Sequence, residues 1–299
     1  MERLLSVLKG KKDRGLLRKL RAVDHRGPGV VVRGGERLLD FSSNDYLGIS
    51  SHPYIKKASS EALNRWGTAS SASRLLSGSL SLHHELEEMT AAFKGKEAAL
   101  VFNSGYQANV GIISSLYGRR DLIFSDRLSH ASILDGIRLS GARHIRYRHN
   151  DMEHLEYLLK KNTPGKDSGR VVITESVFSM DGDMADLQGI VDLKDKYGFR
   201  IMADEAHATG IFGRSGSGMA EQSGLTDRID FIMGTFSKAM GSFGAYLAAS
   251  GPVRDYLVNT CRSFIYSTAL PPSVIAASKA SLELVEQEPF RREVLMKKT

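Results

Sequence analysis

The sequence is poor in cysteine and proline and contains no long apolar run. Its 299 residues include one cysteine, Cys261, and seven prolines. A single cysteine forms neither an intrachain disulfide nor a multi-cysteine metal site, which suits a reducing compartment. No apolar run approaches the roughly 18 residues that span a bilayer, and the N-terminus lacks the apolar core and cleavage site of a secretory signal. We therefore expect a cytoplasmic protein that binds neither membrane nor metal.

The net charge of +7 is concentrated at the two ends of the sequence. Residues 1–26 contain nine Lys or Arg and three acidic residues, and residues 290–299 contain four and one. Leucines recur at helical spacing in the first segment, at Leu4, Leu5, Leu8, Leu16, Leu17 and Leu20. This pattern predicts a basic amphipathic helix that lies on the main body. Because the excess charge is confined to the ends, we do not expect nucleic-acid binding.

Beyond residue 40, short β-prone runs alternate with amphipathic stretches of helical length. The predicted strands are 98–102, 122–124, 171–174, 201–203, 231–233 and 245–249. The predicted helices are 81–93, 106–116, 152–160 and 187–197. Before them, two β-prone runs around Gly34 and Gly35 predict a hairpin. The alternation implies an α/β fold with a mainly parallel central sheet flanked by helices.

Polar residues follow several of these predicted strands, where an open α/β sheet binds its ligands. Asp204 ends an apolar strand with no basic residue close after it, so it requires a hydrogen-bond network or a cationic partner. Lys238 lies among small and apolar residues, and burial there would lower the pKa of its amine and make it nucleophilic toward a carbonyl. Taken alone, Asp204 could simply cap a helix, and Lys238 could be an ordinary surface lysine.

The other candidates complete a set. Thr235 and Ser237, with Ser104 and the Gly105 amide at a strand-to-helix turn, can donate hydrogen bonds to a phosphate. His130 opens a predicted helix and could place its ring over an aromatic ligand. An acidic partner, a flat ring, phosphate donors and a desolvated lysine are together what pyridoxal phosphate requires of a protein.

Seven motifs then resemble the α-oxoamine synthases, which are fold-type I enzymes that use pyridoxal phosphate. They lie at 41–48, 103–109, 126–132, 175–182, 204–207, 235–238 and 266–272. These enzymes join an amino acid to an acyl thioester with loss of carbon dioxide. The resemblance implies the same cofactor and a homodimer with active sites shared between subunits.

The resemblance also implies a role for each matching residue. Lys238 would form the Schiff base with the cofactor, Asp204 would pair with the pyridine nitrogen, and His130 would stack on the ring. His207 and Ser179 would bind the phenolic oxygen of the cofactor. The phosphate would be bound by Ser104, Gly105, Tyr106 and Thr235, with Ser267 and Thr268 reaching it from the neighbouring subunit. Arg18 and Asn44 match positions on the substrate side.

Within this family the sequence most resembles the members that join L-alanine to a pimeloyl thioester in biotin synthesis. The alternatives are relatives that use glycine or serine, namely 2-amino-3-ketobutyrate CoA ligase, 5-aminolevulinate synthase and serine palmitoyltransferase. The acyl donor is coenzyme A or an acyl carrier protein, and the basic N-terminal arm would suit an acidic partner of the second kind.

The resemblance divides the chain into an N-terminal arm of basic helix and hairpin (1–40), a large cofactor-binding domain (41–289) and the start of a truncated small domain (290–299). Family members take an arginine for the substrate carboxylate from that small domain. The sequence argues against two rival functions. A nucleic-acid-dependent ATPase would need a G-x-x-x-x-G-K-[ST] loop, which the sequence lacks. A non-catalytic assembly subunit would have no need of Lys238.

Overall fold

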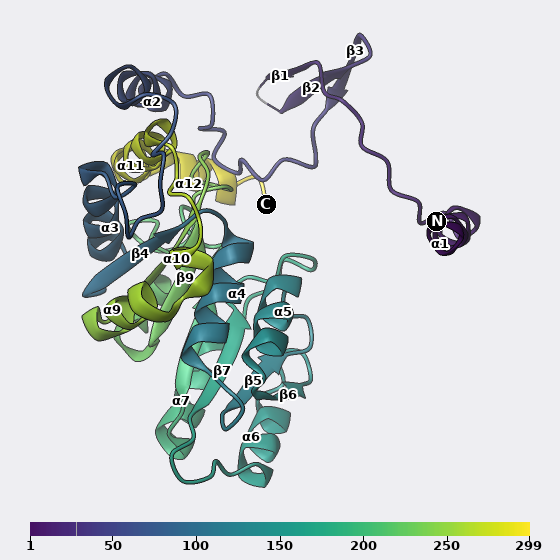
Figure 1. Cartoon of the computed structure of the whole chain (residues 1–299), viewed down its shortest axis with the longest axis vertical. Helices are drawn as coiled ribbons and strands as arrows, with labels where there is room; N and C mark the ends of the chain where they lie inside the picture. The colour runs from purple at the N-terminus through teal and green to yellow at the C-terminus, as the bar shows by residue number, and fades with distance from the viewer. Residues whose placement is uncertain (28) are drawn as a thin grey trace. The chain divides into compact units, whose positions relative to one another are not determined.

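In the described residues of this computed structural model, 1–27 and 29–299, a seven-stranded sheet forms the centre of the unit Asn44–Thr299 (Figure 1). Its strand order is β4 (Ala98–Phe102), β10 (Ala245–Ala249), β9 (Phe231–Thr235), β8 (Arg200–Asp204), β7 (Arg170–Glu175), β5 (Leu122–Asp126) and β6 (Arg143–Tyr147). β10 is antiparallel to both of its neighbours, and the pairs from β9 to β6 are parallel. The predicted mainly parallel α/β sheet is confirmed.

Helices cover both faces of this sheet (Figure 1). In chain order they are α2 (Pro53–Trp66), α3 (Ser81–Phe93), α4 (Gly105–Leu116), α5 (Ala131–Ser140), α6 (Met152–Lys161), α7 (Leu187–Tyr197), α8 (Met219–Gln222), α9 (Gly251–Thr260), α10 (Arg262–Ile265), α11 (Pro272–Gln287) and α12 (Phe290–Met296), with a 3-10 turn at Thr226–Arg228. In the described chain, no helix is long and apolar enough to cross a membrane.

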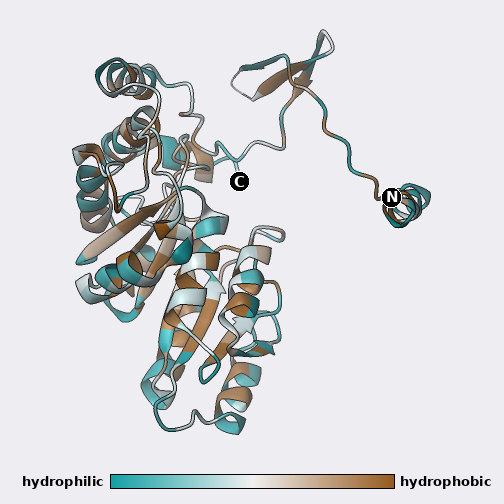
Figure 2. Cartoon of the chain, viewed as in Figure 1, coloured by the Kyte–Doolittle hydropathy of each residue, from teal (hydrophilic) through white to brown (hydrophobic). Residues whose placement is uncertain are grey.

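Two apolar cores lie on opposite faces of the sheet, because successive side chains of a strand point to opposite sides. In β4, Ala99 and Val101 join the core that contains Leu86 of α3, whereas Leu100 and Phe102 join the core that contains Ile112 of α4. Figure 2 shows the hydrophobic residues concentrated along these strands and on the inner faces of the helices. The polar residues at the carboxyl ends of the strands lie outside these two cores and are available to bind a ligand.

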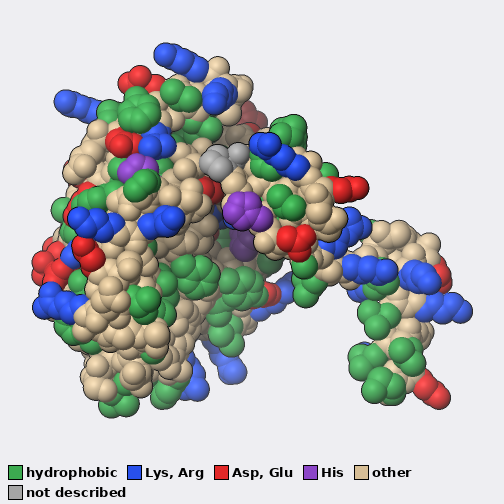
Figure 3. Space-filling model, turned by 90° about the horizontal axis from the view of Figure 1, so that it is seen from above, with side chains coloured by type: hydrophobic (Ala, Val, Ile, Leu, Met, Phe, Trp, Pro, Cys, Tyr) green, Lys and Arg blue, Asp and Glu red, His purple; other side chains and the backbone are tan. Residues whose placement is uncertain are grey.

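The unit Met1–Ser43 contains α1 (Glu2–Asp13) and a three-stranded sheet of β1 (His25–Gly27), β2 (Val30–Arg33) and β3 (Glu36–Leu39). The predicted hairpin is confirmed: β2 pairs with β3 in antiparallel register around Gly34 and Gly35. Basic side chains are abundant on this part of the surface (Figure 3).

The expectation that the N-terminal helix continues through Leu16, Leu17 and Leu20 is wrong. The helix ends at Asp13, and the next turn contains Gly15 at φ +66°. A positive φ interrupts an α-helix and is readily adopted by glycine. The leucines beyond it lie in irregular backbone.

Two strands do not follow from the sequence patterns. β6 (Arg143–Tyr147) reads as Arg-His-Ile-Arg-Tyr and lies at the edge of the sheet, where polar side chains remain exposed. β1 has three residues. Both lack the apolar run on which the strand predictions rested.

Candidate active site

A cavity of about 250 Å³ opens at the carboxyl ends of β7, β8 and β9 and at the N-termini of α4 and α5. It is lined by Ser104, Gly105, Tyr106, Asn109, His130, Ser132, Glu175, Asp204, Ala206, His207, Met233, Thr235, Ser237 and Lys238. Parallel strands end at the same edge, so residues distant in sequence meet there. Nine residues that are predicted from the sequence share this cavity: Ser104, Gly105, Tyr106, His130, Asp204, His207, Thr235, Ser237 and Lys238.

Lys238 and His207 are joined by a short hydrogen bond, with 2.6 Å between Nζ and Nε2. Burial lowers the pKa of Lys238 below its ordinary value. The pKa of His207 is lowered to about 4 by burial and by the nearby charge of Lys238. A neutral imidazole can accept a hydrogen bond from the lysine amine through Nε2. Burial thus favours the neutral, nucleophilic form of the Lys238 amine, and the hydrogen bond to His207 fixes its position.

Tyr46 extends this chain of hydrogen bonds away from the cavity. Its hydroxyl lies 2.8 Å from Nδ1 of His207 and 3.1 Å from Oδ1 of Asn44. Since Asn44 Oδ1 can only accept, the tyrosine proton points to Asn44. The Tyr46 oxygen then accepts the Nδ1 proton of His207, and Nε2 remains the acceptor for Lys238.

Asp204 is buried at the end of β8, with 4% of its surface exposed. Its carboxylate accepts hydrogen bonds from the side chain of Asn109 (2.8 Å) and from the backbone of Ala206 (2.9 Å). Among the described residues it forms no ion pair within 4.0 Å. The cationic partner that the sequence led us to expect is therefore left for a ligand to supply.

Glu175 lies beside Asp204, at the paired position on the neighbouring strand. Burial, followed by the negative charge of Asp204, raises the pKa of Glu175 to about 8. Its Oε1 accepts the backbone N–H of His130 at 2.7 Å. Glu175 is not among the site residues predicted from the sequence. It could have been, because it opens the motif at 175–182 and follows a predicted strand, as Asp204 does.

The N-terminus of α4 provides a site for an anion. Ser104 caps the helix by accepting the N–H of Gln107 at 3.2 Å. The free N–H groups of the first helical turn, which belong here to Gly105 and Tyr106, are the groups that bind phosphate in many proteins. A Cβ on Gly105 would lie 3.3 Å from Cε of Met233, so a side chain would crowd this turn. The Tyr106 hydroxyl instead bonds Asp135.

Thr235, which ends β9, lies beside this turn, because a Cβ on Gly105 would be 4.0 Å from Cβ of Thr235, and Ser237 follows two residues later. Their hydroxyl oxygens are 2.7 Å apart, and Thr235 Oγ1 also donates to the backbone oxygen of Gly244 at 2.7 Å. Because Thr235 donates to Gly244, the hydroxyl proton of Ser237 points to Thr235. Ser237 is exposed and can turn toward a ligand.

His130 is the N-cap of α5, as the sequence suggested. Its Nδ1 accepts the backbone N–H of Ser132 at 3.2 Å and lies 2.7 Å from the Ser132 hydroxyl. Ser132 was not predicted, because serine in a first helical turn is common.

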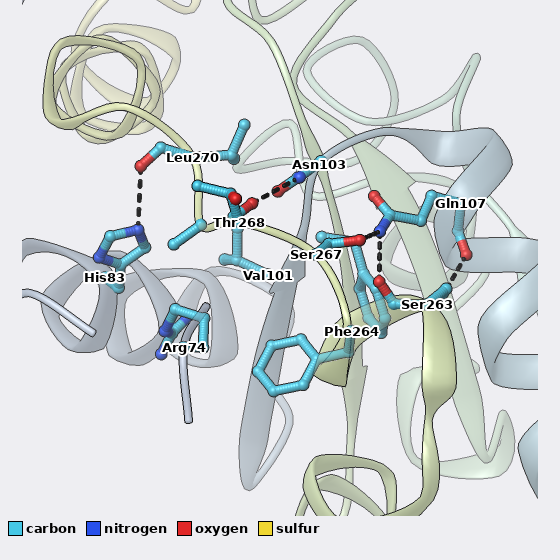
Figure 4. A pocket seen from close by; sticks show the side chains of 12 residues that line it. Arg74, His83, Val101, Asn103, Gln107, Ser263, Phe264, Ser267, Thr268 and Leu270 are labelled. Carbon is cyan, nitrogen blue, oxygen red and sulfur yellow. Dashed lines mark hydrogen bonds between the residues drawn. The ribbon is translucent and has the colours of Figure 1, made fainter. Parts of the chain in front are cut away.

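Five predicted residues lie elsewhere. Ser179 is exposed and its backbone N–H bonds Glu175. Asn44 is exposed and contacts the site through Tyr46. Arg18 belongs to the other unit, Met1–Ser43, where it is exposed. Figure 4 shows Ser267 and Thr268 around a separate, small cavity, where they bond Gln107 and Asn103. The functional roles of all five stay predictions.

The charges of the cavity allow a test of its fit to pyridoxal phosphate. Asp204 requires a cation, and a protonated ring nitrogen supplies one. The first turn of α4 suits the phosphate, and Lys238 lies on the same cavity wall for the aldehyde. Asn109 Oδ1 is buried without a hydrogen-bond partner among the described residues, which also favours a polar ligand. The residues present fit this cofactor.

Comparisons with known proteins agree with this fit. Residues 36–299 match the profile of the family described as aminotransferase class I and II. The chain is 53% identical over 276 residues to 8-amino-7-oxononanoate synthase of Geotalea daltonii, covering 92% of this chain and 70% of that protein.

Two solved structures are also similar. Serine palmitoyltransferase of S. paucimobilis, solved with a bound adduct of pyridoxal phosphate and myriocin, has a TM-score of 0.91 and 34% identity, covering 97% of this chain and 73% of that one. An 8-amino-7-oxononanoate synthase of Francisella tularensis has a TM-score of 0.72 and 30% identity, covering 85% and 71%. The chain belongs to the aminotransferase class I and II family and, within it, to the pyridoxal-phosphate-dependent α-oxoamine synthases.

Proposed function

We propose that this protein condenses L-alanine with a pimeloyl thioester to form 8-amino-7-oxononanoate, carbon dioxide and a free thiol, a step of biotin synthesis. The observation that carries the proposal is the cavity in which Lys238, His207 and Asp204 meet beside the N-terminus of α4. The choice of substrates is supported by the 53% identity to a synthase of that name.

Bound pyridoxal phosphate bonds covalently to an amine and stabilises negative charge on the carbon next to that nitrogen. Asp204 would hold the pyridine nitrogen in its protonated form, which strengthens that stabilisation. His130 would hold the ring plane, so that the breaking C–H bond stays aligned with it. The amine of Lys238, favoured in its neutral form by burial, would take the α-proton of alanine and later return a proton to the product.

The partners and location of the protein extend this proposal. A homodimer would bring Ser267 and Thr268 of one subunit to the phosphate of the other, which accounts for their place outside the cavity of their own chain. The basic segment 1–26 would suit an acidic acyl carrier protein. The single cysteine, buried and free, is consistent with the cytoplasm. Residues 290–299, which contain α12, would begin the smaller domain.

A spectroscopic titration tests the cofactor and the amino-acid site. We expect the purified chain to gain the visible absorption band of lysine-bound pyridoxal phosphate, Lys238→Ala to lack it, and L-alanine to shift it. Lys279→Ala, which removes a partly buried lysine paired with Glu85 outside the cavity, is the matched control. A folded chain that gains no band would contradict the proposal.

A product assay then decides between substrates. With pimeloyl-coenzyme A, we expect release of carbon dioxide and thiol with L-alanine, and much slower release with glycine or L-serine. Serine as the preferred amino acid would favour the function of the structural neighbour from S. paucimobilis instead. Faster turnover with pimeloyl acyl carrier protein, lost on charge reversal at Lys11, Lys12 and Lys19, would identify the carrier as the donor.

A further inference from the structure

Asn109 lines the cavity and ends the motif at 103–109, but neither the motif nor the expected cofactor contacts assign it a role. It lies one turn after Gly105 on α4 and is 1% exposed. Its side-chain amide donates one hydrogen to Oδ2 of Asp204 at 2.8 Å and the other to Oγ of Ser132 at 2.9 Å. A single amide group thus joins the ends of three elements, α4, β8 and α5.

The orientation of this amide is determined by its partner. A carboxylate oxygen only accepts hydrogen bonds, so the Asn109 nitrogen, and not its oxygen, must face Asp204. Turning the amide over would place two acceptor oxygens in contact within a buried site and would forfeit both bonds. The Asn109 nitrogen therefore also donates to Ser132.

The direction of the next bonds follows from the first. Because Ser132 Oγ accepts from Asn109, its own proton is free to point to Nδ1 of His130, 2.7 Å away. The backbone N–H of Ser132 points to the same nitrogen at 3.2 Å, and a backbone N–H can only donate. Nδ1 must then carry a lone pair, and the ring proton of neutral His130 lies on Nε2.

We propose that Asn109 is a positioning residue that holds the carboxylate of Asp204 and, through Ser132, fixes His130 as the tautomer protonated on Nε2. Two groups that contact the cofactor under the proposed function would then be set by one amide. The Nε2 atom of His130 has no partner among the described residues, so its N–H remains available as a donor to a ligand in the cavity. The consequence for the cofactor rests on the proposed function, whereas the tautomer does not.

The tautomer can be measured directly in the full chain without cofactor. Histidine ring nitrogens labelled with ¹⁵N give distinct NMR signals when protonated and when carrying a lone pair, and His130→Gln identifies the pair that belongs to His130. We expect unprotonated Nδ1 and protonated Nε2 in the wild type. Ser132→Ala removes the shorter of the two hydrogen bonds to Nδ1 and keeps the backbone N–H, so it should shift both signals part of the way toward a mixture of tautomers. Ser114→Ala, on α4, is the matched control because its hydroxyl bonds only backbone oxygens.

Cofactor affinity separates the two branches of the network. Asn109→Leu removes both donors from a side chain of similar size, and we expect it to mix the tautomers and to weaken pyridoxal phosphate binding about tenfold, as loss of a hydrogen bond to a charged group implies. Ser132→Ala leaves the bond to Asp204 intact and should weaken binding less than Asn109→Leu does. Melting temperatures of all variants measure any loss of stability. A variant that is only less stable would keep the wild-type ¹⁵N signals.

Three results would overturn the proposal: a wild-type His130 protonated on Nδ1, wild-type ring signals in Ser132→Ala, or undiminished cofactor affinity in a folded Asn109→Leu. If Asn109→Leu does not fold, Ser132→Ala still decides the tautomer. If the wild-type chain binds no pyridoxal phosphate, the proposed function fails, while the NMR signals still test the role of Asn109 and Ser132.

Discussion

Asp204 and Glu175 are neighbouring buried carboxyl groups with different surroundings. They end adjacent strands in register. Asp204 receives a side-chain and a backbone hydrogen bond, whereas Glu175 receives backbone bonds from His130 and Ser179. Two negative charges this close repel each other, and the pKa of about 8 for Glu175 lets it retain a proton near neutral pH. Asp204 can then bind a cationic ligand while Glu175 stays neutral.

Replacing this second carboxyl group should alter how stability depends on pH. The pKa of Glu175 rises from 4.5 in the unfolded chain to about 8 in the folded chain, so the folded state binds more protons between these values. Its contribution to the free energy of unfolding is complete below pH 4.5 and is lost as the pH rises through 8. We expect the stability of Glu175→Gln relative to wild type to increase over this range, measured by urea denaturation without cofactor.

The comparison between variant and wild type is needed because His207 acts in the opposite direction. Its pKa is lowered from 6.5 to about 4, so its contribution is present above pH 6.5 and is lost as the pH falls through 4. Taking the difference between two chains that both contain His207 removes this effect. A pH-independent difference between Glu175→Gln and wild type would contradict the assigned pKa.

Tyr46 should matter through the position of His207. Tyr46→Phe removes the hydrogen bond to Nδ1 and leaves the aromatic ring in place. Loss of one such bond corresponds to roughly 1 kcal/mol, so we expect about fivefold weaker binding of pyridoxal phosphate by absorbance titration. Tyr256→Phe, half-exposed on α9, provides a control that should bind as the wild type does.

The sequence predicted where these residues meet better than it predicted which residues support them. Lys238, Asp204 and His207 could be selected because each follows an apolar strand, and strand ends share an edge. Asn109 and Tyr46 lie in the motifs at 103–109 and 41–48, but their roles could not be assigned, because these depend on partners from elements far away in sequence. An asparagine within a helix carries no local signal for such a contact.

At the scale of elements, a buried ion pair secures the segment that follows β8. Lys94, at the end of α3, is fully buried, and its Nζ lies 2.6 Å from Oε2 of Glu205 and 3.2 Å from Oγ1 of Thr209. The other carboxylate oxygen of Glu205 accepts the N–H of Ala220 at 2.7 Å. Since Glu205 lies between Asp204 and His207 in the chain, this pair fixes the backbone that presents both to the cavity.

Breaking that pair should be costly. Lys94→Met leaves the Glu205 charge buried without its partner, and we expect a loss of about 3–5 kcal/mol in the free energy of unfolding. Lys57→Met, which breaks an exposed pair with Glu61 on α2, should cost less than about 1 kcal/mol. Chemical denaturation of the two variants makes the comparison, and equal losses would show that burial of the first pair has no effect.

Element boundaries were predicted well where apolar runs were buried on both sides, as in β4 and β10. They were missed where pairing with a neighbour, and not side-chain burial, makes the strand, as in β6. The helical spacing of the leucines up to Leu20 predicted too long a helix, because that spacing takes no account of the positive φ of Gly15. Periodicity describes which side chains could share a face, whereas the backbone decides whether that face forms.

At the scale of the whole molecule, the proposed dimer makes a prediction about mixed sites. Thr268 is exposed in its own chain, so Thr268→Asp should leave the fold intact and place a negative charge against the phosphate of the neighbouring subunit. Each variant should be inactive by itself, because Lys238→Ala lacks the amine and the charge of Thr268→Asp repels the phosphate. If sites are shared, a mixed dimer has one site with both changes and one site with neither.

Refolding equal amounts of these two inactive variants together should therefore restore about a quarter of the wild-type sites, because half of randomly formed dimers are mixed. Sedimentation would show particles of twice the 32.8 kDa mass of the chain. Dimers that form without restored activity would show that Thr268 does not act across the interface.

The strand order has a consequence for how the protein matures on the ribosome. β4 is among the first strands of the central sheet to be synthesised, yet its neighbour in the sheet is β10, the last of the seven. Until residues 245–249 leave the exit tunnel, β4 has no partner strand, and its backbone N–H and C=O groups that face β10 remain unpaired. A nascent chain arrested while residues 245–249 are still inside the tunnel should therefore recruit molecular chaperones far more strongly than one arrested after they have emerged.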